Sequence, residues 1–335
     1  QRCGKGNTKV EGSEDVGEVK AKPEALRALV AAIFKAVGSD ADEAACIAQN
    51  LVLANLSGHD SHGIGLVPIY VDGVETGAVR TNGRFEIVAD SGSLVTVDAG
   101  MAFGQTIGRD AMALAIERVR RDGIVILGIR NSHHLGRIGH WAETCCEAGF
   151  ASTHYVNTLG IKAHVAPWGG ADARYSTNPY CCGIPGPDGV PFLLDMATSQ
   201  VALGKVRVAR NKGVEMAPGL IIDGEGRATT DPNALYEDPI GAILPFGTYK
   251  GFGLAVVSEL LAGALTGGGT YHAGTPQTGV IHNNMLSIVF DPDRLGAAKT
   301  WREDLAASLG WIKASRPAPG GTGVLLAGEP ERRAR

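Results

Sequence analysis

The segment GHDSHG, residues 58–63, places two histidines beside an aspartate and a serine. Imidazole exchanges a proton near neutral pH, so His62 is a candidate acid/base group, and Asp60 or Ser61 could orient its ring. A loop that follows a predicted helix keeps such groups accessible while the helix positions them. A loop with ordinary surface histidines would have the same sequence, and the segment alone favours neither interpretation.

A second histidine pair, His133 and His134, lies in NSHHLG, residues 131–136. This segment follows a predicted buried strand and precedes a predicted helix, and ligands collect at the carboxyl ends of strands in α/β folds. The positive end of the helix dipole favours the neutral imidazole that a base requires. This pair therefore indicates function more strongly than the first, although one histidine could cap the helix while the other packs.

Two further segments could bind a ligand. Glycines flank Lys250 in PFGTYKGFG, where backbone amides and the ammonium group could approach a phosphate or carboxylate, although a plain turn into a helix would look the same. Asp195 ends an apolar strand, so its carboxylate could bind a ribose hydroxyl or hold a loop. The patterns GxxxxGK[ST] and GxGxxG are absent, which argues against nucleoside triphosphate hydrolysis and against a standard dinucleotide-binding βαβ unit.

The spacing of apolar residues predicts the elements that hold these segments. We expect helices from Pro23 to Gly38, from a cap at Ser39 or Asp40 to Leu56, and over residues 67–77. Farther along, predicted strands alternate with predicted helices: strands at 94–99, 123–131, 150–157, 191–197 and 285–292, and helices at 106–123, 137–149 and 251–268. This alternation predicts an α/β fold with a mostly parallel or mixed sheet covered on both faces.

Composition excludes several classes of protein. The chain has 31 Lys and Arg against 35 Asp and Glu, so it lacks the basic excess of a nucleic-acid binder. No stretch approaches the roughly 20 apolar residues that span a membrane. Residues 1–22 have no apolar core and are predicted to be a disordered leader rather than a signal peptide. The six cysteines lack CxxC spacing, so we expect reduced thiols, a cytoplasmic protein and no metal.

Taken in order, these segments resemble the type-2 malate/L-lactate dehydrogenase family, which is distinct from the Rossmann-type enzymes of similar name. The matching strings run from about residue 25 to residue 331 and are HDSHGIG, NSHHLGRIGHWAE, AGF, STNP, LLDMATS, GK, TTDP, YKGFGLA and LLAGEPE. Within the family, GHDSHGIG followed by VP and the tyrosine at Tyr70, and then by NSHHLGRIG and WAE, is most similar to the hydroxycarboxylate dehydrogenase B type.

The resemblance implies a non-Rossmann NAD(P)-binding domain with a mixed sheet and a smaller helical substrate domain. We expect a helical cap or substrate domain at 23–92, the NAD(P)-binding domain at 93–290, and a C-terminal segment at 291–335 that returns to the first domain. Because related chains continue beyond the GEPE turn, this last segment is expected to be shortened. The resemblance also implies a homodimer, NAD or NADP as cofactor with NAD preferred, and interconversion of 2-hydroxy and 2-oxo acids.

Three alternatives remain at this point. The first is reduction of a cyclic imino acid by NAD(P)H, which needs the same hydride geometry. The second is a metal-dependent hydrolase in which His59, His62 and His134 are ligands. The third is a non-catalytic metabolite-binding protein.

Matching positions also imply roles for individual residues. His134 corresponds to the catalytic proton acceptor, with His62 as a supporting acid/base residue. Substrate binding is expected from Ser61, His133 and Arg137. Cofactor contacts are expected from His62, Thr158, Asp195, Met196, Ala197, Lys250, Asn283 and the turn Gly328-Glu329-Pro330.

One departure from the family pattern concerns the substrate carboxylate. Many members have an arginine where this chain has Leu66, and Ile69 nearby is also apolar. A bidentate arginine–carboxylate pair is strong and directional, so its loss is not neutral. We therefore expect either that Arg137 or Lys250 takes over that contact or that the substrate range differs.

Overall fold

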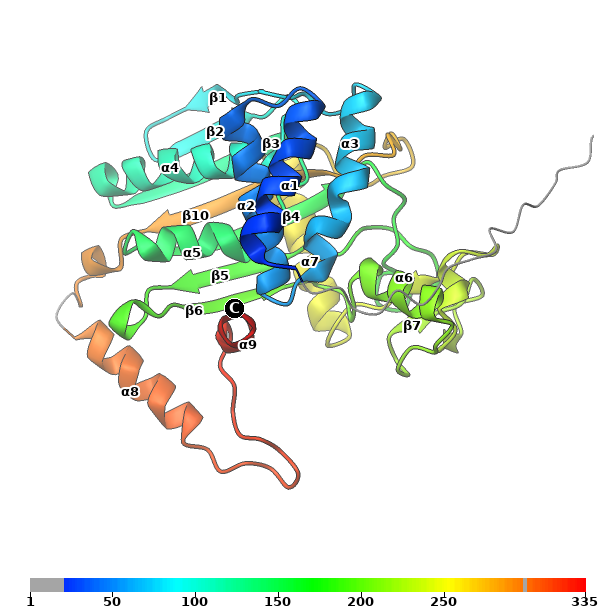
Figure 1. Cartoon of the computed structure of the whole chain (residues 1–335). Coiled ribbons are helices and arrows are strands. Elements are labelled where there is room, and N and C mark those ends of the chain that lie inside the picture. The colour runs from blue at the N-terminus through cyan, green and yellow to red at the C-terminus, as the bar shows by residue number, and fades with distance from the viewer. Residues whose placement is uncertain (1–20, 298–299) are drawn as a thin grey trace, which may run out of the picture.

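A seven-stranded mixed sheet forms the centre of the computed structural model, which describes residues 21–297 and 300–335 (Figure 1). The strand order is β1-β2-β3-β10-β4-β5-β6, in which β2 and β3 are parallel and the other neighbours antiparallel. The strands are β1 (Glu86–Asp90), β2 (Leu94–Asp98), β3 (Ile124–His133), β4 (Ala151–Leu159), β5 (Tyr180–Ile184), β6 (Phe192–Met196) and β10 (His282–Phe290). The prediction of an α/β fold with a mixed sheet is confirmed. Of the predicted leader, all but residues 21 and 22 lie outside the described residues.

Three N-terminal helices pack beside the sheet, as predicted: α1 (Pro23–Ala36), α2 (Ala41–Leu56) and α3 (Val67–Glu75) (Figure 1). Asp40 is the N-cap of α2, because its carboxylate accepts a hydrogen bond from the Glu43 amide at 2.8 Å. Phe34 and Tyr70 share a core with Phe103, which precedes the next helix. This core holds α3, and therefore Tyr70, against the main domain.

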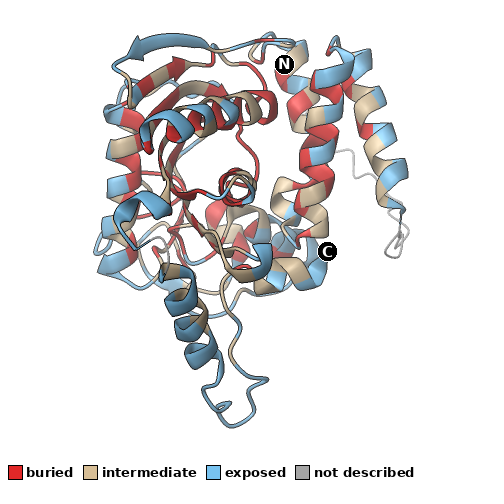
Figure 2. Ribbon diagram, turned by 90° about the vertical axis from the view of Figure 1, so that its left-hand side faces the viewer, coloured by how far each residue is buried: buried red, intermediate tan, exposed pale blue. Residues whose placement is uncertain are grey.

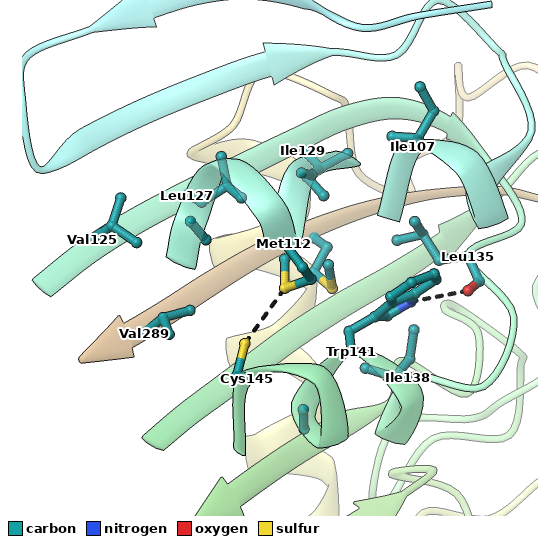
Figure 3. Packing of buried hydrophobic residues seen from close by; sticks show 14 of the residues in the cluster. Ile107, Met112, Val125, Leu127, Ile129, Leu135, Ile138, Trp141, Cys145 and Val289 are labelled. Atoms are coloured by element: carbon teal, nitrogen blue, oxygen red, sulfur yellow. Dashed lines mark hydrogen bonds between the residues drawn. The ribbon is translucent and has the colours of Figure 1, made fainter. Parts of the chain in front are cut away.

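Two helices, α4 (Gly104–Asp122) and α5 (Gly139–Glu147), cover one face of the sheet (Figure 3). Trp141 packs directly on α4 at Gly108, where a Cβ atom would lie 2.4 Å from its ring. Its indole Nε1 donates a hydrogen bond to the Leu135 carbonyl at 3.1 Å. This contact fixes the loop between β3 and α5, the loop that contains His134.

The opposite face is covered by α7 (Tyr249–Ser258) and its π-helical continuation η5 (Glu259–Ala264). The predicted apolar helix is confirmed, although it begins at Tyr249. Figure 2 shows buried residues concentrated in the sheet and on the helix faces that contact it. The main core therefore lies between these layers.

A small unit inserted between β6 and α7 has no counterpart in the predicted elements. It contains α6 (Leu203–Lys212) and a three-stranded sheet of β8 (Ala228–Thr229), β7 (Ile221–Ile222) and β9 (Ala242–Ile243). Its separate apolar cluster includes Val206, Ile221 and Ile243. The insertion places α6 beside the N-terminal helices (Figure 1).

The C-terminal part consists of α8 (Trp301–Lys313) and α9 (Glu329–Ala334). Helix α8 extends from the body with no buried residue, whereas α9 returns to it (Figures 1 and 2). The Arg335 guanidinium donates hydrogen bonds to Ser57 at 2.9 Å and to Glu143 at 2.6 Å. The last residues thus contact both the end of α2 and α5. No helix in the described ranges is long and apolar enough to cross a membrane.

Candidate active site

His62 and His134 line the same cavity, which has a volume of about 290 Å³. Their ring centroids are 5.4 Å apart, and the ring planes are inclined by 28°. His62 comes from the turn between α2 and α3, whereas His134 follows β3. The cavity therefore lies where the N-terminal helices meet the sheet, and it brings together the two histidines that the sequence singled out.

The turn that holds His62 is fixed by Asn55, at the end of α2. The Asn55 side chain accepts a hydrogen bond from the Ile64 amide at 2.8 Å and donates one to the Asp60 carboxylate at 2.6 Å. Ser61, the other predicted partner, has its hydroxyl 2.9 Å from Nδ1 of His62. Ser61 therefore orients the ring, and Asp60 stabilises the turn instead.

His134 is held by a chain of hydrogen bonds from Tyr70 and Gln105, neither of which was predicted to have a role in the site. Its Nδ1 lies 2.6 Å from the Tyr70 hydroxyl, and that hydroxyl lies 3.1 Å from Nε2 of the buried Gln105. The same Gln105 nitrogen lies 3.3 Å from the His134 carbonyl oxygen. A carbonyl oxygen only accepts, so the amide NH₂ group must face it and must also donate to Tyr70.

This arrangement determines the tautomer of His134. Burial raises the pKa of Tyr70, so the phenol keeps its proton. Because Gln105 donates to the phenol oxygen and no other acceptor for the phenol proton lies among the described residues, that proton is directed to Nδ1 of His134. The ring proton of a neutral His134 then resides on Nε2, which has no hydrogen-bond partner within the described residues.

His62 and His134 are neutral near pH 7. Burial lowers the pKa of His62 to about 4, with smaller contributions from the charges of His59 and Arg137. Burial also holds the pKa of His134 well below its ordinary value, and His62 and His133 lower it further. A neutral imidazole can accept a proton from a hydroxyl group or donate a hydrogen bond to a carbonyl group.

His133, predicted to bind substrate, packs behind the cavity and does not line it. Its ring lies edge-on to Tyr70, with centroids 4.5 Å apart, and also contacts Phe103. Successive side chains of a strand point to opposite faces, which separates His133 from His134. The prediction for His133 therefore needs correction: it packs, and its neighbour faces the cavity.

Thr158 and Asn283, predicted cofactor residues, line the cavity from the neighbouring strands β4 and β10. Asn283 donates to the Thr158 hydroxyl at 3.0 Å and accepts from the Leu135 amide at 2.9 Å. These bonds connect the sheet to the loop of His134. Since Thr158 accepts the Asn283 bond, its own hydroxyl proton stays available for a ligand.

Arg137 and Asp195 lie outside the cavity and are occupied by other contacts. The buried guanidinium of Arg137 pairs with Glu143 and lies 3.9 Å from Asp195. The Asp195 carboxylate accepts a hydrogen bond from the Gly139 amide at 2.7 Å, in the first turn of α5. The Asp195 carboxylate thus holds the loop before α5, one of the two roles considered for it, and Arg137 does not line the cavity.

The remaining predicted cofactor residues also lie outside the cavity lining. These residues are Met196, Ala197, Lys250, Gly328, Glu329 and Pro330. These residues nevertheless lie in or near strand β6 and the segment that continues from it. Gly328 packs on Leu193 of β6, and the segment after β6 pairs with the loop before α7 through Ser199 and Pro245. Lys250 is exposed in the first turn of α7.

Apolar side chains form much of the cavity wall, including Leu66 and Ile69 where the family pattern led us to expect a polar contact. Among the described lining residues, the one with a permanent positive charge is Arg207 of α6. No motif in the sequence pointed to Arg207, because α6 was itself not predicted.

The three histidines of the metal-dependent hydrolase alternative do not converge. His59 lies 3.3 Å from the Glu331 carboxylate of α9, whereas His62 and His134 face the cavity. Within the described residues, no group of three His, Cys, Asp or Glu side chains is arranged to hold a metal ion.

Comparison with known proteins gives consistent matches over the described chain. Residues 21–335 match the family described as malate/L-lactate dehydrogenase. Hydroxycarboxylate dehydrogenase B of Escherichia coli O157:H7 is 45% identical over 308 residues, which cover 91% of this chain and 84% of that protein. L-lactate dehydrogenase of Cupriavidus necator is 39% identical over 307 residues, covering 91% of this chain and 88% of that protein.

A similar solved structure is that of Δ1-piperideine-2-carboxylate reductase from Pseudomonas syringae. It superposes with a TM-score of 0.81 at 30% sequence identity, covering 95% of this chain and 93% of that chain.

Proposed function

This chain belongs to the malate/L-lactate dehydrogenase family, and from that premise we propose that the cavity containing His62 and His134 is its active site. The protein is an oxidoreductase that interconverts 2-hydroxy and 2-oxo acids with a nicotinamide cofactor. The observation that supports this site best is the pair of neutral, stacked imidazoles, one of them held in a defined tautomer. Such a pair suits proton exchange with the oxygen at C2 of the substrate.

The nicotinamide, when bound, supplies or accepts the hydride at C2. The donors present fit its carboxamide, because Thr158 lines the cavity and has a hydroxyl proton that the Asn283 bond leaves available. We propose that Thr158 holds the carboxamide and that Asn283 fixes Thr158.

We assign to His134 the role of hydrogen-bond donor. Its Nε2–H, set by Tyr70, polarises the substrate carbonyl and stabilises the negative charge that develops on its oxygen during reduction. The site pre-organises this donor, so no reorientation is needed as the charge develops.

We assign the proton transfer itself to His62. Its Nδ1 contacts the Ser61 hydroxyl, which both donates and accepts, so Nε2 is able to hold or release a proton. In the oxidation direction His62 takes the proton of the substrate hydroxyl, and in reduction it returns that proton. This proposal reverses the roles expected from the family resemblance, in which His134 was the proton acceptor and His62 the supporting residue.

The two predicted domains share the site in this proposal. The helical part, residues 23–92, contributes His62 and Tyr70, and the part at 93–290 contributes His134 and Thr158. We propose that both parts face the substrate and that the second part also binds the cofactor, whose remaining length follows β6 towards Lys250. We further propose NAD over NADP and a homodimer, to be measured by kcat/KM with each cofactor and by light scattering.

The proposed function is tested by following oxidation of NADH and NADPH with a panel of 2-oxo acids. Reduction of at least one 2-oxo acid is expected, and the absence of turnover across the panel would remove the proposal. A cyclic imino acid belongs in the same panel, because the Pseudomonas syringae relative is named as a reductase of such a compound. Turnover of the imino acid without any turnover of 2-oxo acids would favour that second function.

A further inference from the structure

A site for 2-hydroxy acids must bind their carboxylate, and neither residue expected for that contact lines the cavity. Arg137 is buried against Glu143, and Lys250 lies outside on α7. Leu66, at the position where many family members have an arginine, is apolar and 5% exposed. The carboxylate partner must therefore come from another element.

Helix α6 is the element that brings a positive charge to the cavity. Its first turn lies against the turn of His62, so closely that a Cβ atom on Gly204 would be 3.1 Å from Cβ of Ser61. Leu203 and Gly204 both line the cavity, as does Arg207 one turn later. Residues three and four apart share one face of a helix, so Arg207 projects along the same face as the turn that contacts Ser61.

The guanidinium of Arg207 is unengaged. Among the residues that the structure describes, no hydrogen bond or ion pair involves it. Arg210, one turn later, differs: its guanidinium lies 4.3 Å over the Tyr236 ring and donates to Asn233 at 3.2 Å. Of these two arginines, only Arg207 lines the cavity, and only Arg207 is free to bind a ligand there.

Two other features favour an anion at the same place. The N-terminus of α6 has no side-chain cap at Ala202, which lines the cavity, so amide groups and the positive end of the helix dipole face it. His134, only 9% exposed, presents an unpartnered Nε2–H from the opposite element. A 2-oxo acid carries two neighbouring acceptors, a carboxylate and a carbonyl oxygen, that suit these two groups of donors.

We propose that Arg207, together with the first turn of α6, binds the carboxylate of the 2-hydroxy or 2-oxo acid and so determines specificity for acids. This inference rests on the proposed function of the cavity. The inserted unit that contains α6 then has a role in substrate recognition. In this proposal an arginine from α6 supplies the positive charge that Leu66 lacks.

The test compares Arg207→Gln with Arg210→Gln, a matched change one turn along the same helix. For pyruvate or another accepted 2-oxo acid, Arg207→Gln should raise KM about 10- to 100-fold, as expected for a lost charge-assisted hydrogen bond. The Kd of the reduced cofactor should stay within about twofold, and Arg207→Lys should recover part of the loss. Arg210→Gln should leave KM close to that of the native protein.

A second readout removes the substrate charge instead of the arginine. The native protein should prefer the acid to its methyl ester, and Arg207→Gln should lose most of that preference. Equal KM values in the Arg207→Gln and Arg210→Gln variants would overturn the proposal. So would a weakened cofactor with an unchanged KM, because Arg207 would then serve the cofactor phosphate.

Binding of oxamate, an unreactive 2-oxo acid analogue, separates this inference from the proposed function. Calorimetry with the reduced cofactor present should show a Kd raised by a similar factor in Arg207→Gln. If the native protein reduces no 2-oxo acid, the proposed function fails. The oxamate Kd still shows whether Arg207 binds a carboxylate. An oxamate Kd unchanged by the substitution would overturn the role of Arg207.

Discussion

The Tyr70 hydroxyl lies 2.6 Å from Nδ1 of His134 and donates its proton there. This bond joins α3 of the N-terminal helices to the loop after β3, and Gln105 fixes its direction. The N-terminal helices thus do more than cover the cavity, because they determine which nitrogen of His134 carries the proton. The predictions for Tyr70, His62 and His134 depend on this arrangement.

Tyr70→Phe should lower kcat about tenfold or more, because His134 loses the partner that fixes its tautomer. It should also cost roughly 1–3 kcal/mol of stability, because the buried amide of Gln105 loses an acceptor. Steady-state kinetics and thermal unfolding measure both effects.

Tyr175→Phe is the matched control. Tyr175 is also buried and donates its hydroxyl proton to the Ala166 carbonyl at 3.2 Å, away from the cavity lining. This variant should lose stability but keep kcat. Equal kcat values for Tyr70→Phe and Tyr175→Phe would contradict the role of Tyr70.

His62→Asn should reduce kcat by about 10²–10⁴, the usual contribution of an acid/base group. His134→Asn should lose less, because an asparagine amide still donates a hydrogen bond to the substrate oxygen. Kinetics of both variants in both reaction directions decide between the two histidines. A larger loss for His134→Asn would restore His134 as the base and refute the division of roles.

Buried histidines should make the protein sensitive to acid. Burial lowers the pKa to about 3 for His133 and His154 and to about 4 for His62 and His140. The unfolded chain binds these protons from about pH 6.5 downwards, whereas the folded protein does not, so stability is full above that pH and is lost as pH falls towards 4. Unfolding by urea at several pH values measures this loss.

His154→Gln isolates one such histidine, which lies away from the cavity between Ser287 and Ser152. Between pH 6.5 and 4.5 the free energy of unfolding should fall less in the variant than in the native protein. The difference between the two decreases should reach about 2–3 kcal/mol. Identical pH dependence in the two proteins would show that His154 does not stay neutral when folded.

The sequence predicted those parts of the fold whose signals are local. The N-terminal helices follow apolar periodicity and the cap at Asp40, and β3 and β4 are recognisable as apolar runs. The strands β7, β8 and β9 are two residues long, and α6 has mostly polar and charged surface positions, so neither produces a pattern. Arg207 was therefore not anticipated.

Site residues show the same division. His62 and His134 stand in distinctive polar segments, whereas Tyr70 and Gln105 look like ordinary helical residues. Their function depends on a contact between α3 and α4, which tertiary packing creates and local sequence does not encode. Arg137 and Asp195 are the opposite case, because their side chains could bind a ligand but contact groups at the start of α5 instead. Arg137 lies near Asp195, and Asp195 accepts a hydrogen bond from the Gly139 amide.

Lys250→Ala should weaken binding of the reduced cofactor about 5- to 50-fold, the effect of losing one charged contact to a phosphate. The change should leave kcat at saturating cofactor nearly unaltered, because Lys250 does not line the cavity. Fluorescence titration measures the Kd, with Lys212→Ala as the exposed control on α6. A Kd equal to that of the control would exclude Lys250 from the cofactor site.

The central claim, hydride transfer to C2 of a 2-oxo acid, is tested most directly with reduced cofactor deuterated at nicotinamide C4. Mass spectrometry and NMR of the product should find the deuterium at C2 of a 2-hydroxy acid when the transferred face is labelled. His62→Asn should slow this transfer without changing where the label goes. A 2-hydroxy acid product without deuterium at C2 from either labelled face, or no product from any 2-oxo acid, would contradict the account.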